Sequence, residues 1–303
     1  MAERIAAIDC GTNSIKLLIG EESQVLVRES RMVRLGQGVD TTGLLAPEAL
    51  GRTFAAVDEF AELVRTYRVT RIRFCATSAT RDAANAEVFT EGVRERLGVT
   101  PEVLSGAEEA ALVFAGAVAP LQGELETPVL VVDVGGGSTE LVLGGGTPDV
   151  AVSMDIGSVR LHERHLHDDP PLPEQVAACV DDIDRHLRRS PVPVGDARSV
   201  IGTSGTIKTL AAAMLALPFY DRDAIDGVEL GVADTAAYVE RLVGMTVAER
   251  RAIPSMHPGR ADVIGAGALI WTRVLQSSEV SHYRVSEADI LYGIASTLVG
   301  PDE

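Results

Sequence analysis

The sequence has 303 residues, with 44 acidic side chains against 27 from lysine and arginine, and a formal net charge of −17. Such a surface repels nucleic acid and anionic membranes, because proteins that bind them rely on lysine and arginine to neutralise phosphates. No apolar run approaches the roughly 20 residues of a membrane-spanning helix, and the N-terminus lacks the features of a signal peptide, so we expect a cytoplasmic protein.

The length exceeds that of one typical core, which predicts two domains. In chain order, the first half predicts a hairpin at 4–20, strands at 24–35, 69–75 and 103–104, and helices at 47–67, 82–97 and 105–118. Ser105 and Glu108 have the spacing of a capping box at the start of the last helix. The polar segment 122–128 is interpreted as a linker, which divides the chain into domains 1–124 and 125–303.

The second half repeats this order. It predicts a hairpin at 128–144, helices at 157–167 and 174–189, a strand and turn at 200–206 that lead into a helix with Lys208, a helix at 260–275, and a strand end and helix at 285–298. Alternating strands and helices are typical of the α/β class. Trp271 is interpreted as a core residue. Two groups of side chains are interpreted as solvated helix faces: His162, His165 and His167, and Asp181, Asp182 and Asp184.

The two hairpins share one pattern without gaps: an apolar strand, an Asp, any residue, a Gly, two turn residues, a Ser and a second apolar strand. One copy alone would be an ordinary hairpin with Asp at its turn, whereas two copies indicate a duplicated domain. Glycine lets the backbone approach a ligand, and successive N–H groups form a concave anion site. The predicted phosphate-binding residues are Gly11, Thr12, Asn13 and Ser14 in the first turn, and Gly135, Gly136, Gly137 and Ser138 in the second.

The acidic surface repels a polyanionic substrate at long range, so its phosphates must be bound locally by backbone N–H groups, a metal ion and a few cations. Asp9 and Asp133 end the first strand of each hairpin and would hold a divalent cation or its waters, for which oxygen ligands suit Mg²⁺. The chain has two lysines, Lys16 and Lys208, and both lie beside turns rich in Gly, Ser and Thr.

Five motifs, in this order, resemble those of the exopolyphosphatase / guanosine pentaphosphate phosphohydrolase (Ppx/GppA) family. They are Asp9-x-Gly-Thr-Asn-Ser14, Ala76-Thr-Ser-Ala-x-Arg81-x-Ala-x-Asn85, Ser105-Gly-x-Glu-Glu109-Ala110, Asp133-x-Gly-Gly-Gly-Ser-Thr-Glu140 and Gly202-x-Ser-Gly-Thr206. Arg260-Ala-Asp-Val-Ile264 and Val285-Ser286 continue the match to the end of the chain. The length resembles the short, two-domain form of the family.

The resemblance implies two ribonuclease-H-like domains of the actin/hexokinase/Hsp70 (ASKHA) superfamily that face each other across a cleft, with the final helix as a candidate to pack back on the first domain. It also implies dependence on Mg²⁺, with Mn²⁺ as the alternative, and a homodimer. Glu109 matches the family's catalytic glutamate and Asp133 its metal-associated aspartate; Asp9 and Glu140 are further candidate metal ligands.

The expected reaction is water attack on a terminal phosphate, with Glu109 orienting and deprotonating the water and crowding by phosphates and partial burial raising the pKa of this carboxylate. Arg81 is a candidate to bind phosphate through its guanidinium; the alternative is that it forms an ion pair at the surface. Lys208 would meet a distal phosphate, or else is an exposed helix lysine. Without the motif, Glu109 would be a solvated carboxylate in the first turn of a helix.

Inorganic polyphosphate is the leading substrate. Guanosine pentaphosphate is the alternative, because it presents the same terminal phosphoanhydride to the loops. An ATP-dependent sugar or acid kinase and a non-catalytic phosphate or nucleotide sensor stay open as different classes of function. Two departures from the family pattern affect substrate choice: Ala111 follows the Glu-Glu-Ala motif where many members have Arg, and Leu291-Tyr292 replaces an Arg-Glu pair near the final helix.

Overall fold

The computed structural model describes residues 3–21, 24–121 and 125–299. They fall in two compact units, one formed by residues up to Gly116 with those from Ile290 on, and the other by Ala117–Asp289. Residues 122–124 of the predicted linker lie outside the described residues, and the junction between the units lies within helix α5 (Gly106–Val118). Among the described residues, no helix is both long and apolar enough to cross a membrane.

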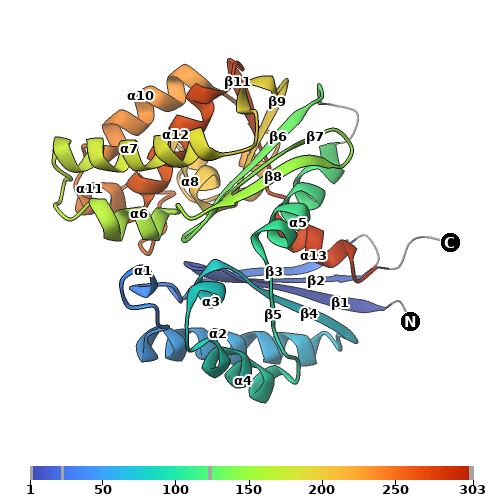
Figure 1. Ribbon diagram of the computed structural model, residues 1–303. Coiled ribbons are helices and arrows are strands. Elements are labelled where there is room, and N and C mark those ends of the chain that lie inside the picture. The colour runs from blue at the N-terminus through green and yellow to red at the C-terminus, as the bar shows by residue number, and fades with distance from the viewer. Residues whose placement is uncertain (1–2, 22–23, 122–124, 300–303) are drawn as a thin grey trace. The chain divides into compact units, whose positions relative to one another are not determined.

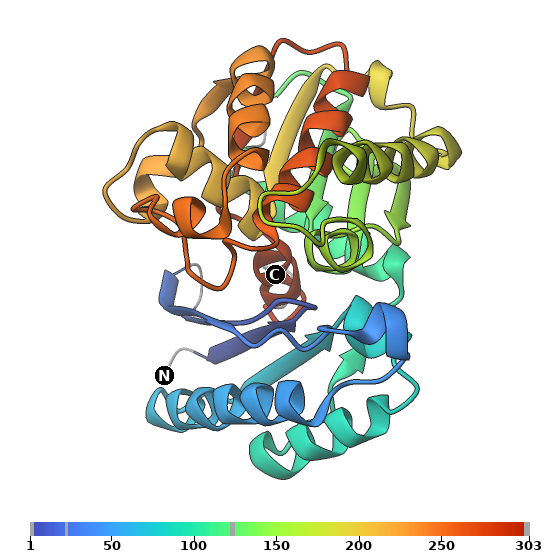
Figure 2. The same cartoon turned by 90° about the vertical axis from the view of Figure 1, so that its left-hand side faces the viewer.

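The first unit is built on a mixed sheet with the order β3-β2-β1-β4-β5 (Figure 1). The strands are β1 (Arg4–Cys10), β2 (Ser14–Glu21), β3 (Gln24–Met32), β4 (Arg71–Ala76) and β5 (Glu102–Val103). Helices α2 (Pro47–Thr66) and α4 (Ala86–Leu97) pack beside each other on one face of this sheet, as Figure 2 shows. Helices α1 (Val39–Thr42) and α3 (Ser78–Asp82) are short.

Helix α13 (Ile290–Ser296) belongs to the first unit although it comes last in the chain. It packs on β1, β2 and β4. A Cβ atom on Gly293 would lie 2.0 Å from the carbonyl oxygen of Leu112, so glycine allows α13 to approach α5 closely. At the positions where many family members have an Arg-Glu pair, Leu291 is buried and the ring of Tyr292 lies 5.4 Å from the guanidinium of Arg28.

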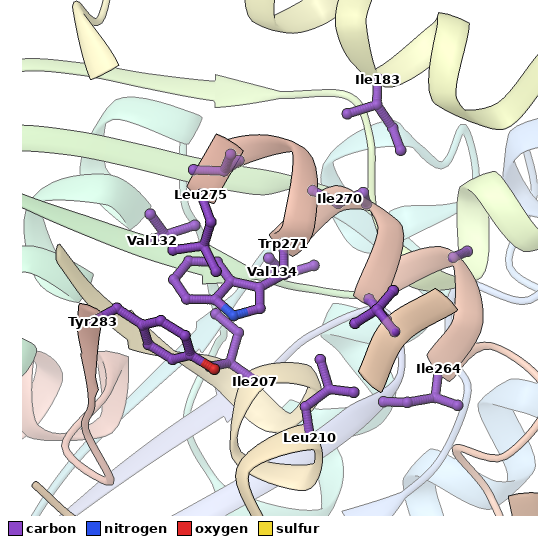
Figure 3. Close-up of a cluster of buried hydrophobic side chains, with 14 of the residues drawn as sticks. Val132, Val134, Ile183, Ile207, Leu210, Ile264, Ile270, Trp271, Leu275 and Tyr283 are labelled. Atoms are coloured by element: carbon purple, nitrogen blue, oxygen red, sulfur yellow. The ribbon is translucent and has the colours of Figure 1, made fainter. Parts of the chain in front are cut away.

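The second unit has a mixed sheet with the order β10-β11-β9-β6-β7-β8. Its strands are β6 (Val129–Val134), β7 (Thr139–Gly144), β8 (Pro148–Met154), β9 (Ser199–Thr203), β10 (Glu229–Gly231) and β11 (His282–Val285). Its helices are α6 (Ser158–His165), α7 (Pro173–Arg189), α8 (Ser204–Met214), α9 (Arg222–Ile225), α10 (Val232–Val243), α11 (Val247–Arg251) and α12 (Ile264–Ser277). Trp271 of α12 is fully buried and meets Tyr283 edge to face at 4.9 Å in the core of this unit (Figure 3), which confirms the prediction for Trp271.

The two hairpins match in register as well as in sequence. Asp9 pairs with Lys16 across β1 and β2, and the equivalent residues Asp133 and Glu140 pair across β6 and β7. The second strand of each hairpin pairs with the strand that follows it, β2 with β3 and β7 with β8. Both pairings shift in register at the equivalent place, after Ile19 and after Leu143. Each first strand, β1 or β6, also pairs in parallel with the fourth strand of its unit, β4 or β9. These shared features confirm the α/β class and the duplicated ribonuclease-H-like domain.

Several predicted elements differ from those observed. The helix predicted at 82–97 begins only at Ala86 in α4, because the backbone is extended at Ala83 after the short helix α3. The helix predicted at 260–275 begins only at Ile264, and Arg260 lies in the preceding turn. The sequence patterns do not predict the elements between α8 and α12, which are α9, β10, α10 and α11.

The solvated-face interpretation is wrong for Asp182 and Asp184. The buried carboxylate of Asp182 accepts a hydrogen bond from Nη1 of Arg164 and contacts Nε2 of His165, each at 2.9 Å. Asp184 accepts two hydrogen bonds from Arg273, at 2.7 and 2.9 Å. These ion pairs join α7 to α6 and α12, so tertiary packing turns part of an apparently solvated face into a structural contact.

Replacing Asp182 by Asn is expected to lower the free energy of unfolding at pH 7 by about 2 kcal/mol, the size of hydrogen bonds to a charged group. Burial opposes ionisation of Asp182, but hydrogen bonds from His165 and Arg164 outweigh it and lower its pKa. The stabilisation is therefore complete above the ordinary pKa of about 3.9 and disappears as the pH falls through the lower folded value. Urea unfolding at several pH values measures this, with exposed Asp181→Asn as control; a difference independent of pH contradicts it.

Candidate active site

The first glycine turn is held by backbone hydrogen bonds. The amide of Gly11 donates to the carbonyl of Ser14 at 3.0 Å, and the amide of Gly36 donates to the carbonyl of Thr12 at 2.9 Å. The side chain of Asn13 is 5% exposed, and both of its amide atoms lack a hydrogen-bond partner among the described residues. Because buried polar groups are normally satisfied, this side chain indicates a place where a ligand completes the turn.

Helix α3 connects this turn to the predicted catalytic carboxylate. The hydroxyl groups of Thr12 and Ser78 lie 2.9 Å apart. Three residues after Ser78, Arg81 donates from Nη1 to Oε2 of Glu109 at 3.1 Å and to the carbonyl of Leu104 at 2.9 Å. Glu109 is only 7% exposed, so the interpretation as a solvated carboxylate is wrong. The first unit thus brings the turn, Arg81 and Glu109 into one region.

The two neighbouring glutamates have different surroundings. Glu108 forms the predicted capping box, in which its carboxylate accepts from the hydroxyl of Ser105 at 2.7 Å and from the Ser105 amide at 2.8 Å. The hydroxyl of Ser105, followed by its amide, lowers the pKa of Glu108. Glu109 is the next residue. Because successive residues of an α-helix are rotated by about 100° around its axis, the side chain of Glu109 lies on another face than that of Glu108. Glu108 therefore stabilises the helix start, and Glu109 is directed elsewhere.

The second glycine turn is closed by the same bond as the first, from the Gly135 amide to the Ser138 carbonyl at 3.0 Å. Its carbonyl oxygens are held by α6. The amide of Ser158 donates to Gly135 at 2.9 Å, and Nε of Arg160 donates to Gly137 at 2.8 Å. With the carbonyl oxygens directed at α6, the turn can offer N–H groups to an anion, as predicted for residues 135–138.

The carboxylates of the two hairpins differ in their cross-strand neighbours. Oδ2 of Asp9 lies 3.5 Å from Nζ of Lys16, so this pair carries opposite charges. At the equivalent register Asp133 faces Glu140, which is 1% exposed and accepts a hydrogen bond from Ser153 at 2.7 Å. Two adjacent carboxylates suit a divalent cation, whereas a carboxylate held by its own lysine does not.

The register pair of Asp133 and Glu140 is a donor set that fits Mg²⁺. Among the described residues, no group of three or more His, Cys, Asp or Glu side chains could hold a metal ion. Mg²⁺ in phosphoryl-transfer sites is typically held by one or two carboxylates together with substrate phosphates and water. Asp133 and Glu140 meet this requirement.

Lys208 is buried, with 3% of its surface exposed, so the alternative of an exposed helix lysine is wrong. Its ammonium group donates to the carbonyl oxygen of Glu287 at 2.9 Å and to the carboxylate of Asp289 at 3.1 Å. The second carboxylate nearby, that of Glu287, lies 3.5 Å away. The phosphate contact of Lys208 stays a prediction, and its ammonium is paired with carboxylates in this structure.

Arg260 is a candidate that sequence reasoning missed. A Cβ atom on Gly205 would lie 2.1 Å from Nη2 of Arg260, so the guanidinium lies directly on the backbone at the start of α8, where a turn was expected. Burial lowers the pKa of Arg260, and the charges of Tyr220 and Asp133 oppose this effect. The motif that begins with Arg260 was available in the sequence, but the residue was assigned to a helix.

Comparison with known proteins identifies the family. The sequence model of the Ppx/GppA phosphatase family matches residues 15–295. The chain belongs to this family. Over 316 aligned residues it is 44% identical to Exopolyphosphatase 2 of Mycobacterium tuberculosis, covering 98% of this chain and 99% of the relative.

Solved structures of Ppx/GppA relatives agree with this assignment. The crystal structure of an exopolyphosphatase-like protein is 43% identical, with a TM-score of 0.94, and covers 97% of this chain and 98% of that one. An exopolyphosphatase from Cytophaga hutchinsonii is 29% identical, with a TM-score of 0.88 and coverage of 98% and 97%. The fold described above is therefore the fold of the family.

Proposed function

We propose that this chain is an exopolyphosphatase, which hydrolyses the terminal phosphate of inorganic polyphosphate. The observation that carries the proposal is the ion pair between the half-buried Arg81 and the buried Glu109, in the same unit as the turn at 11–14. Through α3, whose Ser78 contacts Thr12, the pair connects the carboxylate of Glu109 to a turn that is suited to bind phosphate. The names of the curated relative at 44% identity and of the solved exopolyphosphatase support the same activity.

In this reaction, Glu109 accepts a proton from the attacking water, whose oxygen forms the new bond to the terminal phosphorus as the bond to the bridging oxygen breaks. Arg81 orients Glu109 through its hydrogen bond to Oε2. The turn at 11–14 in the first unit and the turn at 135–138 in the second unit each offer N–H groups that are suited to phosphate oxygens. Arg260 is a further cation for a phosphate group, whereas Lys208 would have to exchange its pairing with Asp289 and Glu287 for such a contact.

Asp133 and Glu140 would hold Mg²⁺, with Mn²⁺ as the alternative; Asp9 is left out because Lys16 already neutralises it. When bound, this metal offsets negative charge on the transferred phosphoryl group. A cytoplasmic location and a homodimer stay predictions.

The test is a parallel assay of the purified protein with Mg²⁺, in which release of phosphate from medium-length polyphosphate, guanosine pentaphosphate and ATP is followed. We expect release to be fastest from polyphosphate. Faster release from guanosine pentaphosphate would make that nucleotide the preferred substrate. Release from ATP alone would contradict the proposed function. Binding of polyphosphate without any release would indicate a sensor.

Replacing Gly157 by Ala is expected to lower kcat/KM for polyphosphate by about 10²-fold, the effect of misplacing binding groups by about 1 Å. The added Cβ would lie 2.4 Å from the Gly136 carbonyl oxygen and 2.6 Å from the Gly137 nitrogen, so the second turn must move. Gly146→Ala is the matched control, since nothing lies within 4 Å of its Cβ. Steady-state kinetics measure the effect, and equal kinetics for both variants contradict it.

A further inference from the structure

Arg250 is a buried cation without a carboxylate partner among the described residues. It lies near the end of α11, and 3% of its surface is exposed. Burial lowers the pKa of its guanidinium, and Asp169 and Asp262 only partly oppose this effect by their charge. A buried charge is costly unless hydrogen bonds satisfy it, so its partners define what Arg250 does.

One side of the guanidinium holds the end of α10. Nε donates to the carbonyl of Leu242 at 3.1 Å, and Nη2 donates to the carbonyls of Val243 at 3.3 Å and Met245 at 2.8 Å. The last carbonyl oxygens of a helix have no partner within the helix. Arg250 supplies a partner to the carbonyl of Val243 and a further one to that of Leu242, which also accepts from the amide of Met245 at 3.2 Å, and so is anchored to the end of α10.

The other side holds the turn that follows Arg260. Nη1 donates to the carbonyls of Ala261 at 3.2 Å and Asp262 at 3.3 Å, so that every N–H of the guanidinium is used. The carbonyl of Arg260 itself accepts bonds from the amides of Val263 at 3.1 Å and Ile264 at 2.8 Å. The turn at 260–263 is thus tied to α10 through Arg250 and to the start of α12 through its own backbone.

We propose that Arg250 is a positioning residue, which keeps the guanidinium of Arg260 against Gly205 by fixing the turn at 260–263. This inference rests on the proposed function, in which Arg260 binds a phosphate group. Lysine cannot replace Arg250 here, because an ammonium group is a point charge and cannot reach carbonyl groups on both sides as a planar guanidinium does.

A double-mutant cycle tests the proposal. Arg250→Lys is expected to lower kcat/KM for polyphosphate by about tenfold in the wild-type background. In the Arg260→Ala background, the same substitution should change kcat/KM by less than about twofold, because the group through which it acts is gone. Equal effects in both backgrounds, or a lower Tm with unchanged kcat/KM, would overturn the proposal. If the wild type released no phosphate, the proposed function itself would fail instead.

Arg273→Lys is the matched control, because Arg273 is held by Asp184 in the same unit and takes no part in the turn. It should lower Tm without changing kcat/KM. Should Arg250→Lys not fold, Val263→Pro loosens the same turn by removing the amide that donates to the Arg260 carbonyl. A folded Val263→Pro protein with wild-type kcat/KM would contradict the proposal, and a reduction that depends on Arg260 would support it.

Discussion

Glu109→Gln is expected to lower kcat for phosphate release from polyphosphate by about 10³-fold, within the usual contribution of a general base. The amide keeps the size of the side chain and can still accept from Arg81, but it cannot take a proton from water. Binding of polyphosphate, measured directly by calorimetry with the inactive variant, should change little. Single-turnover phosphate release separates the chemical step from product release.

Glu108→Gln is the matched control for this experiment. Glu108 is the adjacent residue, but its carboxylate is used in the capping box with Ser105. We expect lower thermal stability and nearly unchanged kcat. If Glu108→Gln lost activity as completely as Glu109→Gln, the assignment of the base to Glu109 would be wrong.

Asp133→Asn is expected to lower phosphate release by about 10²-fold and to raise the Mg²⁺ concentration needed for half-maximal activity. The substitution removes one of two adjacent carboxylates from the register pair with Glu140. Titration with Mg²⁺ after treatment with a chelator measures both effects. High Mg²⁺ should restore part of the activity, since a weakened site fills at higher metal concentration.

Asp9→Asn distinguishes the two equivalent hairpin positions. Asp9 is paired with Lys16 and is not part of the proposed metal site, so the Mg²⁺ midpoint should stay at the wild-type value even if the adjacent turn is disturbed. A midpoint that shifts as far as that of Asp133→Asn would restore Asp9 as a metal ligand and contradict the division proposed here.

The local patterns of the sequence were sufficient to predict the elements on which the fold depends. Alternating apolar residues, a turn glycine and an aspartate describe each hairpin within a short segment, and both hairpins form as predicted. The capping box of Ser105 and Glu108 spans one helical turn and was predicted equally well. These features are decided by neighbours along the chain, so their residue order is enough.

The contacts that give individual side chains their roles were decided by tertiary packing. Arg81 and Glu109 are 28 residues apart, and Lys208 lies 81 residues from Asp289, yet each pair forms an ion pair. Nor could the sequence reveal that Arg260 lies against Gly205. The motifs alone determined the fold class and the identity of the candidate residues other than Arg260. Which cation meets which carboxylate, and which arginine lies against Gly205, depends on how distant segments pack against each other.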